Sequence, residues 1–144
     1  LIQEAAIHNT VALEAKGGAI EIHANAKHST VFGDKLHLSN VINNLIDNAI
    51  KYNHRPPRVA ITTADSPAGL RIQVTDNGIG IPVDEQKRIF ERFYRVPTGN
   101  IHDVKGFGLG LHYVKTVIEH HRGSIAVESK PGAGSTFSIL IPLN

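Results

Sequence analysis

The sequence Asn44-Leu45-Ile46-Asp47-Asn48-Ala49-Ile50-Lys51-Tyr52 ends an amphipathic stretch that begins behind Asp34. Apolar residues recur in this stretch at spacings of three and four, which is the period of one face of an α-helix. Asp34 is a favourable N-cap residue, and Pro56-Pro57 stops any helical continuation. The pattern predicts a helix from about residue 34 to residue 52, with a buried stripe formed by Leu38, Val41, Ile42, Leu45, Ile46 and Ala49.

The polar side of this helix is rich in amides. On a wheel of about 100° per residue, Asn40, Asn48 and Lys51 fall within about 40° of Asn44. A solvated surface is the simplest interpretation, but such surfaces are normally built from Glu, Lys and Arg. An asparagine carbonyl is a neutral, hard oxygen ligand, suited to a magnesium ion that already carries phosphates and water. We therefore expect Asn48 to contact Mg²⁺, with Asn44 and Lys51 facing the phosphates of a nucleotide.

Short alternating segments on both sides of the helix indicate strands. They are expected at 19–24, 29–32, 58–63, 70–75, 124–128 and 135–141, with 29–32 paired to 19–24. Further helices are expected at 1–15, 84–93 and 109–121, while 94–108 lacks periodicity and is expected to be a lid or linker. Two strand pairs are joined by short turns, and strand–helix–strand crossovers are few. The chain is predicted to be an α+β two-layer sandwich, a mixed, mostly antiparallel sheet with helices on one face, in a single domain over residues 1–144.

Size, composition and charge exclude several classes of protein. No run approaches the roughly 20 apolar residues of a membrane span, and no signal peptide opens the sequence. Cysteine is absent, which excludes disulfides and thiolate metal sites. The 9 histidines show no metal-ligand spacing, and the net charge of +2 comes from scattered Lys and Arg, which does not suggest a nucleic-acid surface. Methionine is absent, so we expect the chain to be part of a longer protein.

Three glycine-rich segments follow strands or precede a helix. Asp76-Asn77-Gly78-Ile79-Gly80 places a carboxylate at a strand end, where it can accept a hydrogen bond from the exocyclic amine of adenine. Residues 106–111 run into a helix, whose free N–H groups and dipole favour an anion. Residues 132–137 open the last strand. Each segment alone is equally typical of a turn or hinge, and none is a dinucleotide fingerprint or a Walker A loop.

Taken together and in order, five segments resemble the catalytic ATP-binding domain of sensor histidine kinases, whose fold is shared with gyrase, Hsp90 and MutL. The N box corresponds to residues 44–52, the G1 box to 76–80, the F box to 90–95, the G2 box to 106–111, and the last glycine segment to 132–137. The resemblance covers nearly the whole chain from about residue 20. It implies the Bergerat ATP-binding fold, binding of ATP with Mg²⁺, and a lid over residues 94–108 that becomes ordered with nucleotide.

The resemblance also implies the residues of the site. Asn48 corresponds to the Mg²⁺ ligand and Asp76 to the adenine-binding carboxylate, while Asn44 and Lys51 correspond to groups that act on the phosphates. Either Arg95 or Lys105 is expected at the γ-phosphate. The set expected around the nucleotide is completed by Tyr52, Gly78, Gly80, Ile81, Phe93, Gly106, Gly108, Leu109, Gly110, Leu111 and Thr136, and the bulky Phe107 stands where the family often has Thr or Ser.

The chemistry expected of this set is phosphoryl transfer rather than hydrolysis. Phosphoryl transfer depends mainly on positioning and charge neutralisation. An ATPase also needs a base that orients water, and in hydrolysing relatives this base is a Glu four residues before the Mg²⁺-binding Asn. Asn44 occupies that position here, and it cannot accept a proton at neutral pH. Asp47 lies about 60° round the helix from Asn44 and is a poor substitute.

The phosphate acceptor of the family is a histidine followed directly by Glu or Asp and, after three further residues, by Pro, on a separate helical hairpin. None of the 9 histidines has that context; His102-Asp103 comes nearest, but it lies in the lid segment and lacks the proline. The chain is therefore expected to bind ATP without phosphorylating itself.

The resemblance implies as partners a phosphoacceptor dimerisation domain of the same protein and a response regulator receiver domain. It also implies a homodimeric full-length protein whose cytoplasmic domain this is, at an inner membrane, with no nucleic acid and no direct membrane contact in this chain. Three alternatives are an ATPase of the same fold, a regulatory docking module without catalysis, and a serine-directed kinase acting on anti-sigma partners. Intact Asn48, Asp76 and loop glycines disfavour the docking module, and the F box and long lid favour the sensor kinase.

Overall fold

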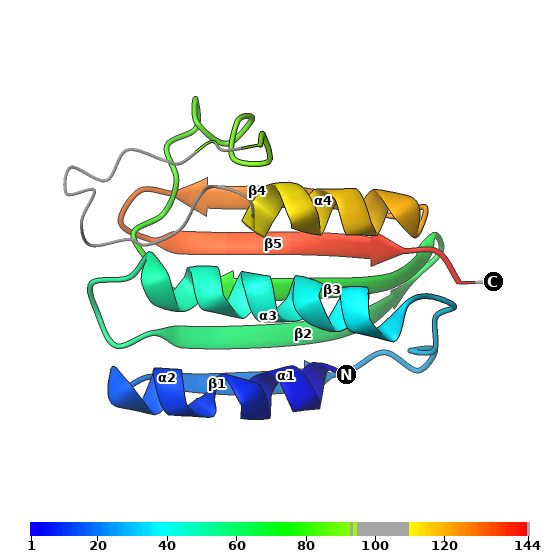
Figure 1. Ribbon diagram of the computed structural model, residues 1–144, viewed down its shortest axis with the longest axis horizontal. Helices are drawn as coiled ribbons and strands as arrows, with labels where there is room; N and C mark the ends of the chain where they lie inside the picture. The colour runs from blue at the N-terminus through cyan, green and yellow to red at the C-terminus, as the bar shows by residue number, and fades with distance from the viewer. Residues whose placement is uncertain (93, 95–109, 144) are drawn as a thin grey trace.

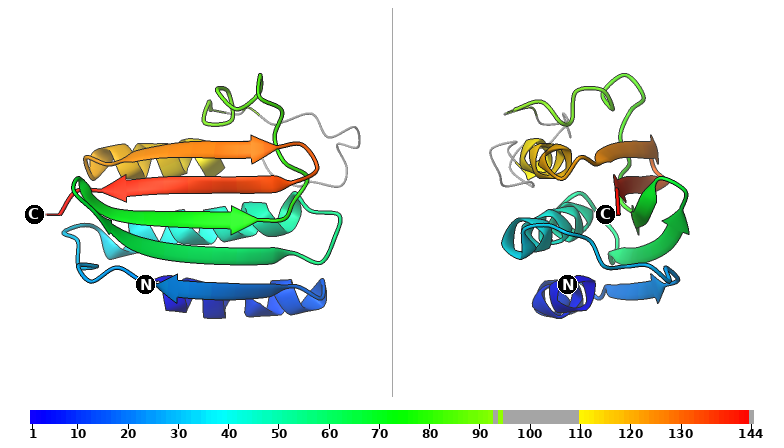
Figure 2. Two further views of the ribbon diagram at one scale, coloured as in Figure 1. Left: turned by 180° about the vertical axis from the view of Figure 1, so that it is seen from behind. Right: turned by 90° about the vertical axis from the view of Figure 1, so that its right-hand side faces the viewer.

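A five-stranded sheet carries the helices on one of its faces (Figure 1). The computed structural model describes residues 1–92, 94 and 110–143. Seen along its edge, this part of the chain forms two layers, and the view from behind shows the sheet face that no helix covers (Figure 2). The predicted α+β sandwich is therefore confirmed. Its elements are α1 (Ile2–His8), α2 (Thr10–Ala15), β1 (Ala19–Ala24), α3 (Lys35–Lys51), β2 (Arg58–Ser66), β3 (Gly69–Asp76), α4 (Gly110–His120), β4 (Ser124–Lys130) and β5 (Gly134–Ile141).

The strand order is β1-β2-β3-β5-β4. The two predicted hairpins, β2–β3 and β4–β5, are antiparallel, and β3 and β5 also pair antiparallel. β1 is an edge strand that runs parallel to β2, because the chain crosses over through α3 between them. This order places the end of β3 beside the start of β5, so that Asp76 lies opposite Ser135.

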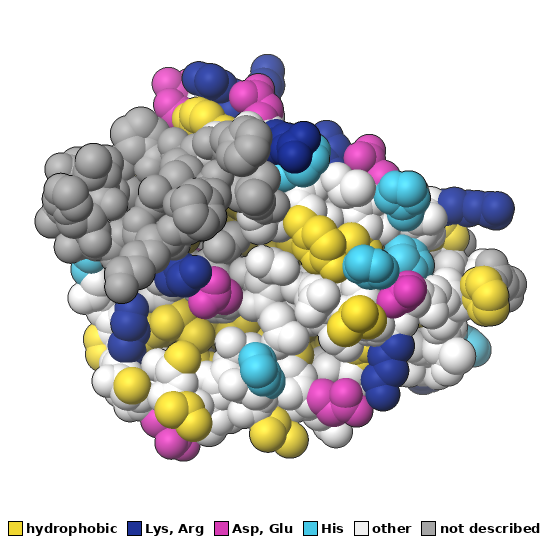
Figure 3. All heavy atoms as spheres, viewed as in Figure 1, with side chains coloured by type: hydrophobic (Ala, Val, Ile, Leu, Met, Phe, Trp, Pro, Cys, Tyr) yellow, Lys and Arg dark blue, Asp and Glu magenta, His cyan; other side chains and the backbone are white. Residues whose placement is uncertain are grey.

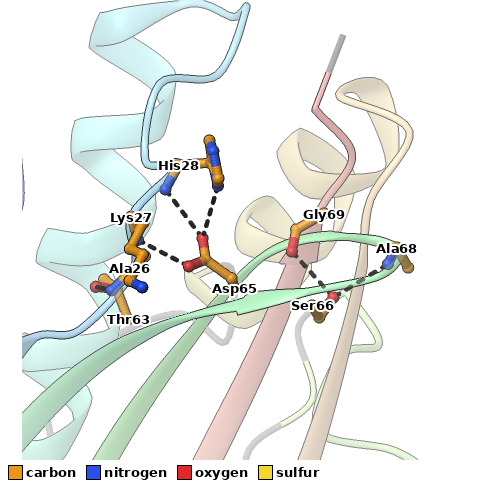
Figure 4. Close-up of polar contacts among 8 residues, drawn as sticks. All are labelled: Ala26, Lys27, His28, Thr63, Asp65, Ser66, Ala68 and Gly69. Carbon is orange, nitrogen blue, oxygen red and sulfur yellow. Dashed lines mark hydrogen bonds and ion pairs between the residues drawn. The ribbon is translucent and has the colours of Figure 1, made fainter.

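The predicted strand at 29–32 is wrong, because side chains rather than a strand partner bind the chain after β1 (Figure 4). The Asp65 carboxylate accepts hydrogen bonds from the backbone N–H groups of Lys27 and His28, each at 2.9 Å. These bonds hold the pKa of the Asp65 carboxyl below its usual value. The loop they anchor lines a cavity of about 480 Å³ with aliphatic walls that include Val31 and Ile141, at the end of the sheet away from Asp76.

The predicted helix at 1–15 is divided in two at Asn9. The side-chain amide of Asn9 donates to the Ala5 carbonyl oxygen at 2.8 Å and to Asn43 Oδ1 of α3 at 3.0 Å. An asparagine side chain that binds the preceding turn competes with the backbone hydrogen bonds of a continuous helix. The break lets both short helices follow the surface of α3 and β1.

α3 is the central helix of the layer, and it matches the prediction closely. The Asp34 side chain caps it by accepting the His37 N–H at 3.0 Å. Its buried stripe contains the six predicted residues and Ile50, and Ile46 is completely buried. Fully burying an aliphatic side chain of this size stabilises a fold by roughly 1.5–3 kcal/mol. The stripe therefore fixes which side of α3 faces the sheet and leaves the amide-rich side free.

The predicted helix at 84–93 is also wrong over the residues that the structure describes. Residues 83–90 form successive turns, in which the N–H of Glu85 donates to the Pro82 carbonyl and that of Arg88 to the Glu85 carbonyl, both at 2.9 Å. Ile89 is buried, and the ring of Phe90 meets Phe137 edge-on with centroids 6.4 Å apart. The apolar side chains thus dock at one point of the core and do not form a stripe along a helix.

Among the described residues, no helix combines the length and the apolar character needed to cross a membrane. On the helical side of the molecule, acidic and basic side chains are interspersed over the surface that Figure 3 colours.

Candidate nucleotide site

Three parts of the chain meet at one edge of the sandwich (Figure 1, left). They are the C-terminal end of α3, the C-terminal end of β3, and the turn between β4 and β5. The sequence-predicted residues Lys51, Tyr52 and Asp76 lie at these ends. Hydrogen bonds between the three elements determine how the side chains are presented.

Asp76 is the last residue of β3, and its carboxylate is held on one side only. Its Oδ1 atom accepts the N–H of Gly78 at 2.8 Å and the N–H of Ser135 at 3.3 Å. Within the described part of the chain, Oδ2 makes no hydrogen bond. Burial raises the pKa of this carboxyl, while the two N–H groups oppose the rise. A half-buried carboxylate with one oriented oxygen that no described residue binds is suited to accept a hydrogen bond from a neutral donor.

The polar side of α3 faces the same edge. The Asn44 amide donates to the Asn40 carbonyl oxygen at 2.7 Å, so its Nδ2 atom points along the helix and its Oδ1 atom is free to face another group. Lys51 Nζ pairs with Asp47 Oδ2 at 2.7 Å, one turn back on the same helix. Asn48 is half-buried, and its side-chain oxygen takes no hydrogen bond from the residues that the structure describes.

Asp76 and α3 are tied together by the loop that follows β3. Ile79 N–H donates to the Tyr52 carbonyl oxygen at 3.0 Å, directly beyond the end of α3. A Cβ atom at Gly78 would overlap that same carbonyl oxygen, so only glycine allows this approach. Asn77 strengthens the junction, because its Oδ1 atom accepts from the buried Asn53 amide at 2.7 Å. The spacing of the adenine-binding candidate from the end of α3 is thereby fixed.

The other side of the same loop contacts the β4–β5 turn. Gly80 has a φ of +75°, and a Cβ atom there would overlap the Lys130 carbonyl oxygen. Gly132 N–H donates to the Ile79 carbonyl oxygen at 2.7 Å. Gly80 therefore permits both the left-handed backbone and the close approach of the two chain segments.

α4 begins beside the polar side of α3. A Cβ atom built on Gly110 would lie 3.1 Å from Asn44 Oδ1, so the start of α4 is in contact with the amide row. Leu111 is half-buried against the core. The first residues of a helix offer free N–H groups and a favourable dipole to anions. Of the remaining predicted residues, Phe93, Arg95, Lys105, Gly106, Gly108 and Leu109, like Phe107 and all of the predicted lid except Tyr94, lie outside the described residues.

Thr136 does not join the other candidates. Neighbouring residues of a strand point to opposite faces of the sheet. The Thr136 hydroxyl lies 3.1 Å from that of its cross-strand neighbour Thr75, on the face that no helix covers. Ser135, one residue earlier, is buried on the same side as Asp76 and binds it through its backbone. Thr136 therefore lies on the other face of the sheet from Asp76, and its contact with a nucleotide stays a prediction. Ser135 is the residue on the side of Asp76.

Three residues around the site were not identified from the sequence: Ser135, Ser129 and Gln86. Ser129 Oγ accepts the N–H of Ile81 at 2.8 Å, and Gln86 Nε2 donates to the Ile81 carbonyl oxygen at 2.9 Å. Ser129 is 48 residues from Ile81 in the chain, and no local pattern marks such a partner. The sheet order alone reveals it, because the β4–β5 turn lies against the loop after β3.

Among the described residues, Asn48 is best suited to bind a hard cation. No group of three or more His, Asp or Glu side chains among the described residues is arranged to hold a metal. A magnesium ion on a nucleotide needs few protein ligands, since phosphates and water supply most of its coordination. A half-buried amide oxygen without a protein partner fits that requirement.

Residues 33–144 match the family described as Histidine kinase-, DNA gyrase B-, and HSP90-like ATPase. The chain belongs to this family. Among its curated relatives, Sensor protein RprX of Bacteroides fragilis is 45% identical over 139 residues, which are 94% of this chain and 27% of the relative. Sensor-like histidine kinase SenX3 of Mycobacterium tuberculosis is 41% identical over 143 residues, which are 99% of this chain and 34% of the relative. The chain thus spans about a quarter to a third of these relatives.

Solved structures agree with this family. The nucleotide-free catalytic domain of histidine kinase ThkA superposes with a TM-score of 0.83 at 26% identity, covering 98% of this chain and 89% of that one. Full-length ShkA in complex with AMPPNP gives a TM-score of 0.84 at 27% identity, covering 98% of this chain and 29% of that one. The resemblance to sensor histidine kinases is confirmed, and the chain is an ATP-binding catalytic domain of this class.

Proposed function

We propose that this domain binds Mg-ATP where α3, β3 and the β4–β5 turn meet, and presents the γ-phosphate to a histidine on a separate dimerisation domain. The observation that carries the proposal is the Asp76 carboxylate, held through Oδ1 with Oδ2 free. Adenine carries an amine at position 6 that donates to such an oxygen. Guanine has a carbonyl there, which would repel it. The site therefore favours adenine.

The phosphates would lie along the polar side of α3 towards the start of α4. Asn48 would hold the magnesium ion through Oδ1, and Lys51 would approach the phosphates from the next turn. When bound, the ion neutralises charge on the phosphate oxygens and helps orient them. The first residues of α4, from Gly110 onward, would add backbone N–H groups near the same oxygens, beside Asn44.

Transfer to another group suits this site better than hydrolysis. The Asn44 amide donates to the Asn40 carbonyl at 2.7 Å, and an amide at this position cannot take a proton from water. Asp47 is a carboxylate on the same helix, but it is paired with Lys51. Neither residue is therefore a good general base. ATPase activity of the purified domain at the rate of a dedicated ATPase would contradict this part of the proposal.

We also propose the partners that the relatives suggest. RprX is a sensor protein, and SenX3 is a sensor-like histidine kinase. By analogy, this domain would act in a homodimeric, inner-membrane sensor, on its cytoplasmic side, and the phosphohistidine would pass its phosphoryl group to a response regulator receiver domain. Radiolabel transfer from ATP to the dimerisation domain, and then to a receiver domain, tests this order.

Calorimetric titration of a non-hydrolysable ATP analogue, with and without Mg²⁺, tests the site itself. Asp76→Asn replaces the free acceptor by a donor, and we expect affinity to fall about a hundredfold, as for a lost hydrogen bond to a charged group. In Asn48→Ala, binding should persist without its dependence on magnesium. Asp65→Asn removes a carboxylate at the other end of the sheet and should bind normally. No binding by the unchanged chain would overturn the proposal and favour a docking module.

A further inference from the structure

Both backbone polar groups of Ile81 are held by side chains from other segments. Its N–H donates to Ser129 Oγ on β4 at 2.8 Å, and its carbonyl oxygen accepts from Gln86 Nε2 at 2.9 Å. Ile81 directly follows the 76–80 loop and is half-buried against the core. The far end of the loop that starts at Asp76 is therefore fixed by two side chains, neither of which belongs to the loop.

Ser129 also holds the opposite wall of the same site. Its hydroxyl donates to the Gly134 carbonyl oxygen at 2.8 Å and lies 2.7 Å from the hydroxyl of Ser135. Because the single proton of Ser129 is directed to Gly134, the Ser135 hydroxyl is the donor between the two serines. The backbone N–H of Ser135 in turn binds Asp76 Oδ1 at 3.3 Å. One hydroxyl group thus links the loop after Asp76 to the strand beside Asp76.

Gln86 closes this arrangement. Its amide donates to the Ile81 carbonyl and to the Ser129 carbonyl, each at 2.9 Å. The two N–H bonds of one amide group therefore bridge the loop and β4 at the same level as the serine hydroxyl. These groups are half-buried, and removing any of them takes away a direct link between the loop and β4.

We infer that Ser129 and Gln86 are positioning residues for base recognition, an inference that rests on the proposed function. They hold the end of the loop 76–81 at a fixed distance from β5. The position of the Asp76 carboxylate relative to β5 depends on that distance. Of the two hydrogen bonds that Asp76 accepts, the one from the Ser135 N–H is the longer. This bond requires β5 to stay close to β3. Loosening the Ser129 link therefore acts on the adenine end of the nucleotide and leaves the phosphate end unchanged.

The experiment compares Ser129→Ala with Ser129→Thr, which keeps the hydroxyl, and with Ser138→Ala as the matched control. Ser138 lies on the uncovered sheet face, where its hydroxyl accepts from Gln73 at 3.1 Å. In the nucleotide-free chain, amide hydrogen exchange at Ile81 should be about tenfold faster in Ser129→Ala, as expected for loss of one hydrogen bond. The threonine variant and the control should retain the slow exchange.

Binding then separates the base from the phosphates. A non-hydrolysable ATP analogue should bind Ser129→Ala about five- to tenfold more weakly, the effect of about 1 kcal/mol, while Mg-tripolyphosphate binds as before. Gln86→Met should repeat this pattern, and it serves in place of the alanine variant if that variant does not fold. Unchanged exchange at Ile81, or an equal loss for both ligands, would overturn the inference. Failure of the unchanged chain to bind the ATP analogue would contradict the proposed function, whereas exchange at Ile81 would still decide the role of Ser129.

Discussion

Asp76 is the residue at which ligand binding and stability oppose each other. Its carboxyl is half-buried, and this desolvation raises its pKa although the N–H groups of Gly78 and Ser135 donate to it. A carboxyl whose pKa is raised on folding contributes stability that is fully present below its unfolded pKa, and that is lost as the pH rises through the folded pKa. Above its folded pKa the ionised Asp76 therefore destabilises the nucleotide-free domain, although it provides the acceptor for adenine.

The resulting prediction concerns Asp76→Asn in the absence of nucleotide. Asparagine keeps an oxygen for the two N–H groups and carries no charge, so thermal unfolding at pH 7 should occur at a higher temperature than in the unchanged chain. The difference should shrink as the pH falls towards the ordinary pKa of aspartate.

Asp65→Asn is the control for this measurement, because the pKa of Asp65 is lowered by the N–H groups of Lys27 and His28. Its stability contribution is present above its unfolded pKa and is lost as the pH falls through the folded pKa. Asp65→Asn should therefore lower the unfolding temperature at pH 7. If both substitutions shifted it in the same direction, the electrostatic explanation would fail.

A second prediction at this scale concerns Asp47, whose carboxylate lies 2.7 Å from Lys51 Nζ. Both side chains are partly exposed, so the pair is worth less than about 1 kcal/mol. Asp47→Asn leaves the ammonium group free for phosphates, and we expect two- to fivefold tighter binding of ATP. The gain should be smaller for ADP, absent for adenosine and weaker at high salt.

Glu4→Gln is the control for Asp47→Asn, because it removes the partner of Lys35, at 3.9 Å, near the other end of α3. It should leave nucleotide affinity unchanged. Weaker binding of Mg-ATP by Asp47→Asn would instead identify Asp47 as a metal ligand.

The sequence identified residues whose type and order follow a family pattern, and it missed residues whose role depends on the sheet. Asn48 and Asp76 stand in motifs, so they were predicted in advance. Ser129 binds Ile81, and Gln86 binds the Ser129 carbonyl, only because the β4–β5 turn lies against the loop after β3. Thr136 is predicted from the last glycine segment, whereas only the register shows that Ser135 is the residue opposite Asp76.

Among the elements, α3 and the two hairpins were predicted well because each has a strong local signal. α3 combines an N-cap, a continuous apolar stripe and a terminating proline pair. The failures at 29–32 and 84–93 have different causes. Asp65 holds the backbone of Lys27 and His28, directly before 29–32. Residues 83–90 bond within successive local turns. Polar side chains such as Asp65, which accepts from backbone N–H groups, and Gln86, which donates to backbone carbonyls, can override a short hydrophobic pattern.

Gly80 and Gly132 have similar backbone angles, so substituting each of them distinguishes the effect of backbone strain from that of a close contact. Gly80 has a φ of +75° and Gly132 a φ of +80°, but only Gly80 has a neighbour, the Lys130 carbonyl oxygen, where its Cβ atom would lie. Gly132→Ala should destabilise the domain by roughly 1–2 kcal/mol, the penalty for the left-handed region. Gly80→Ala should cost more and also weaken nucleotide binding. Equal losses in urea unfolding would show that the loop can move away from β4.

On the scale of the whole molecule, the site exists because the strand order brings remote segments to one edge. Asp76 and Ser135 are 59 residues apart, yet they are direct partners across the β3–β5 ladder. A mixed sheet was predicted, but its order was not, since the parallel pairing of β1 with β2 depends on the path of the chain through α3. The binding site is thus a property of the topology, and the motifs mark only its parts.

The last prediction is that this chain binds Mg-ATP without labelling itself. Five histidines of the described part have polar partners. His37 lies 2.6 Å from the Tyr113 hydroxyl, His112 contacts the Phe90 carbonyl, and His121 accepts the Asp34 N–H. His23 lies 3.3 Å from Glu21, and His28 lies 3.6 Å from Asp65. Incubation with γ-labelled ATP should leave no acid-labile phosphate on the chain, whereas a non-hydrolysable analogue at 100 times its Kd should stabilise it by about 2.7 kcal/mol. The stabilisation shows whether the nucleotide site is occupied. Absence of label then means that the chain lacks a phosphate-accepting histidine, and not that ATP fails to bind. Label on the chain itself would place the acceptor among its own histidines and contradict the division of labour between two domains.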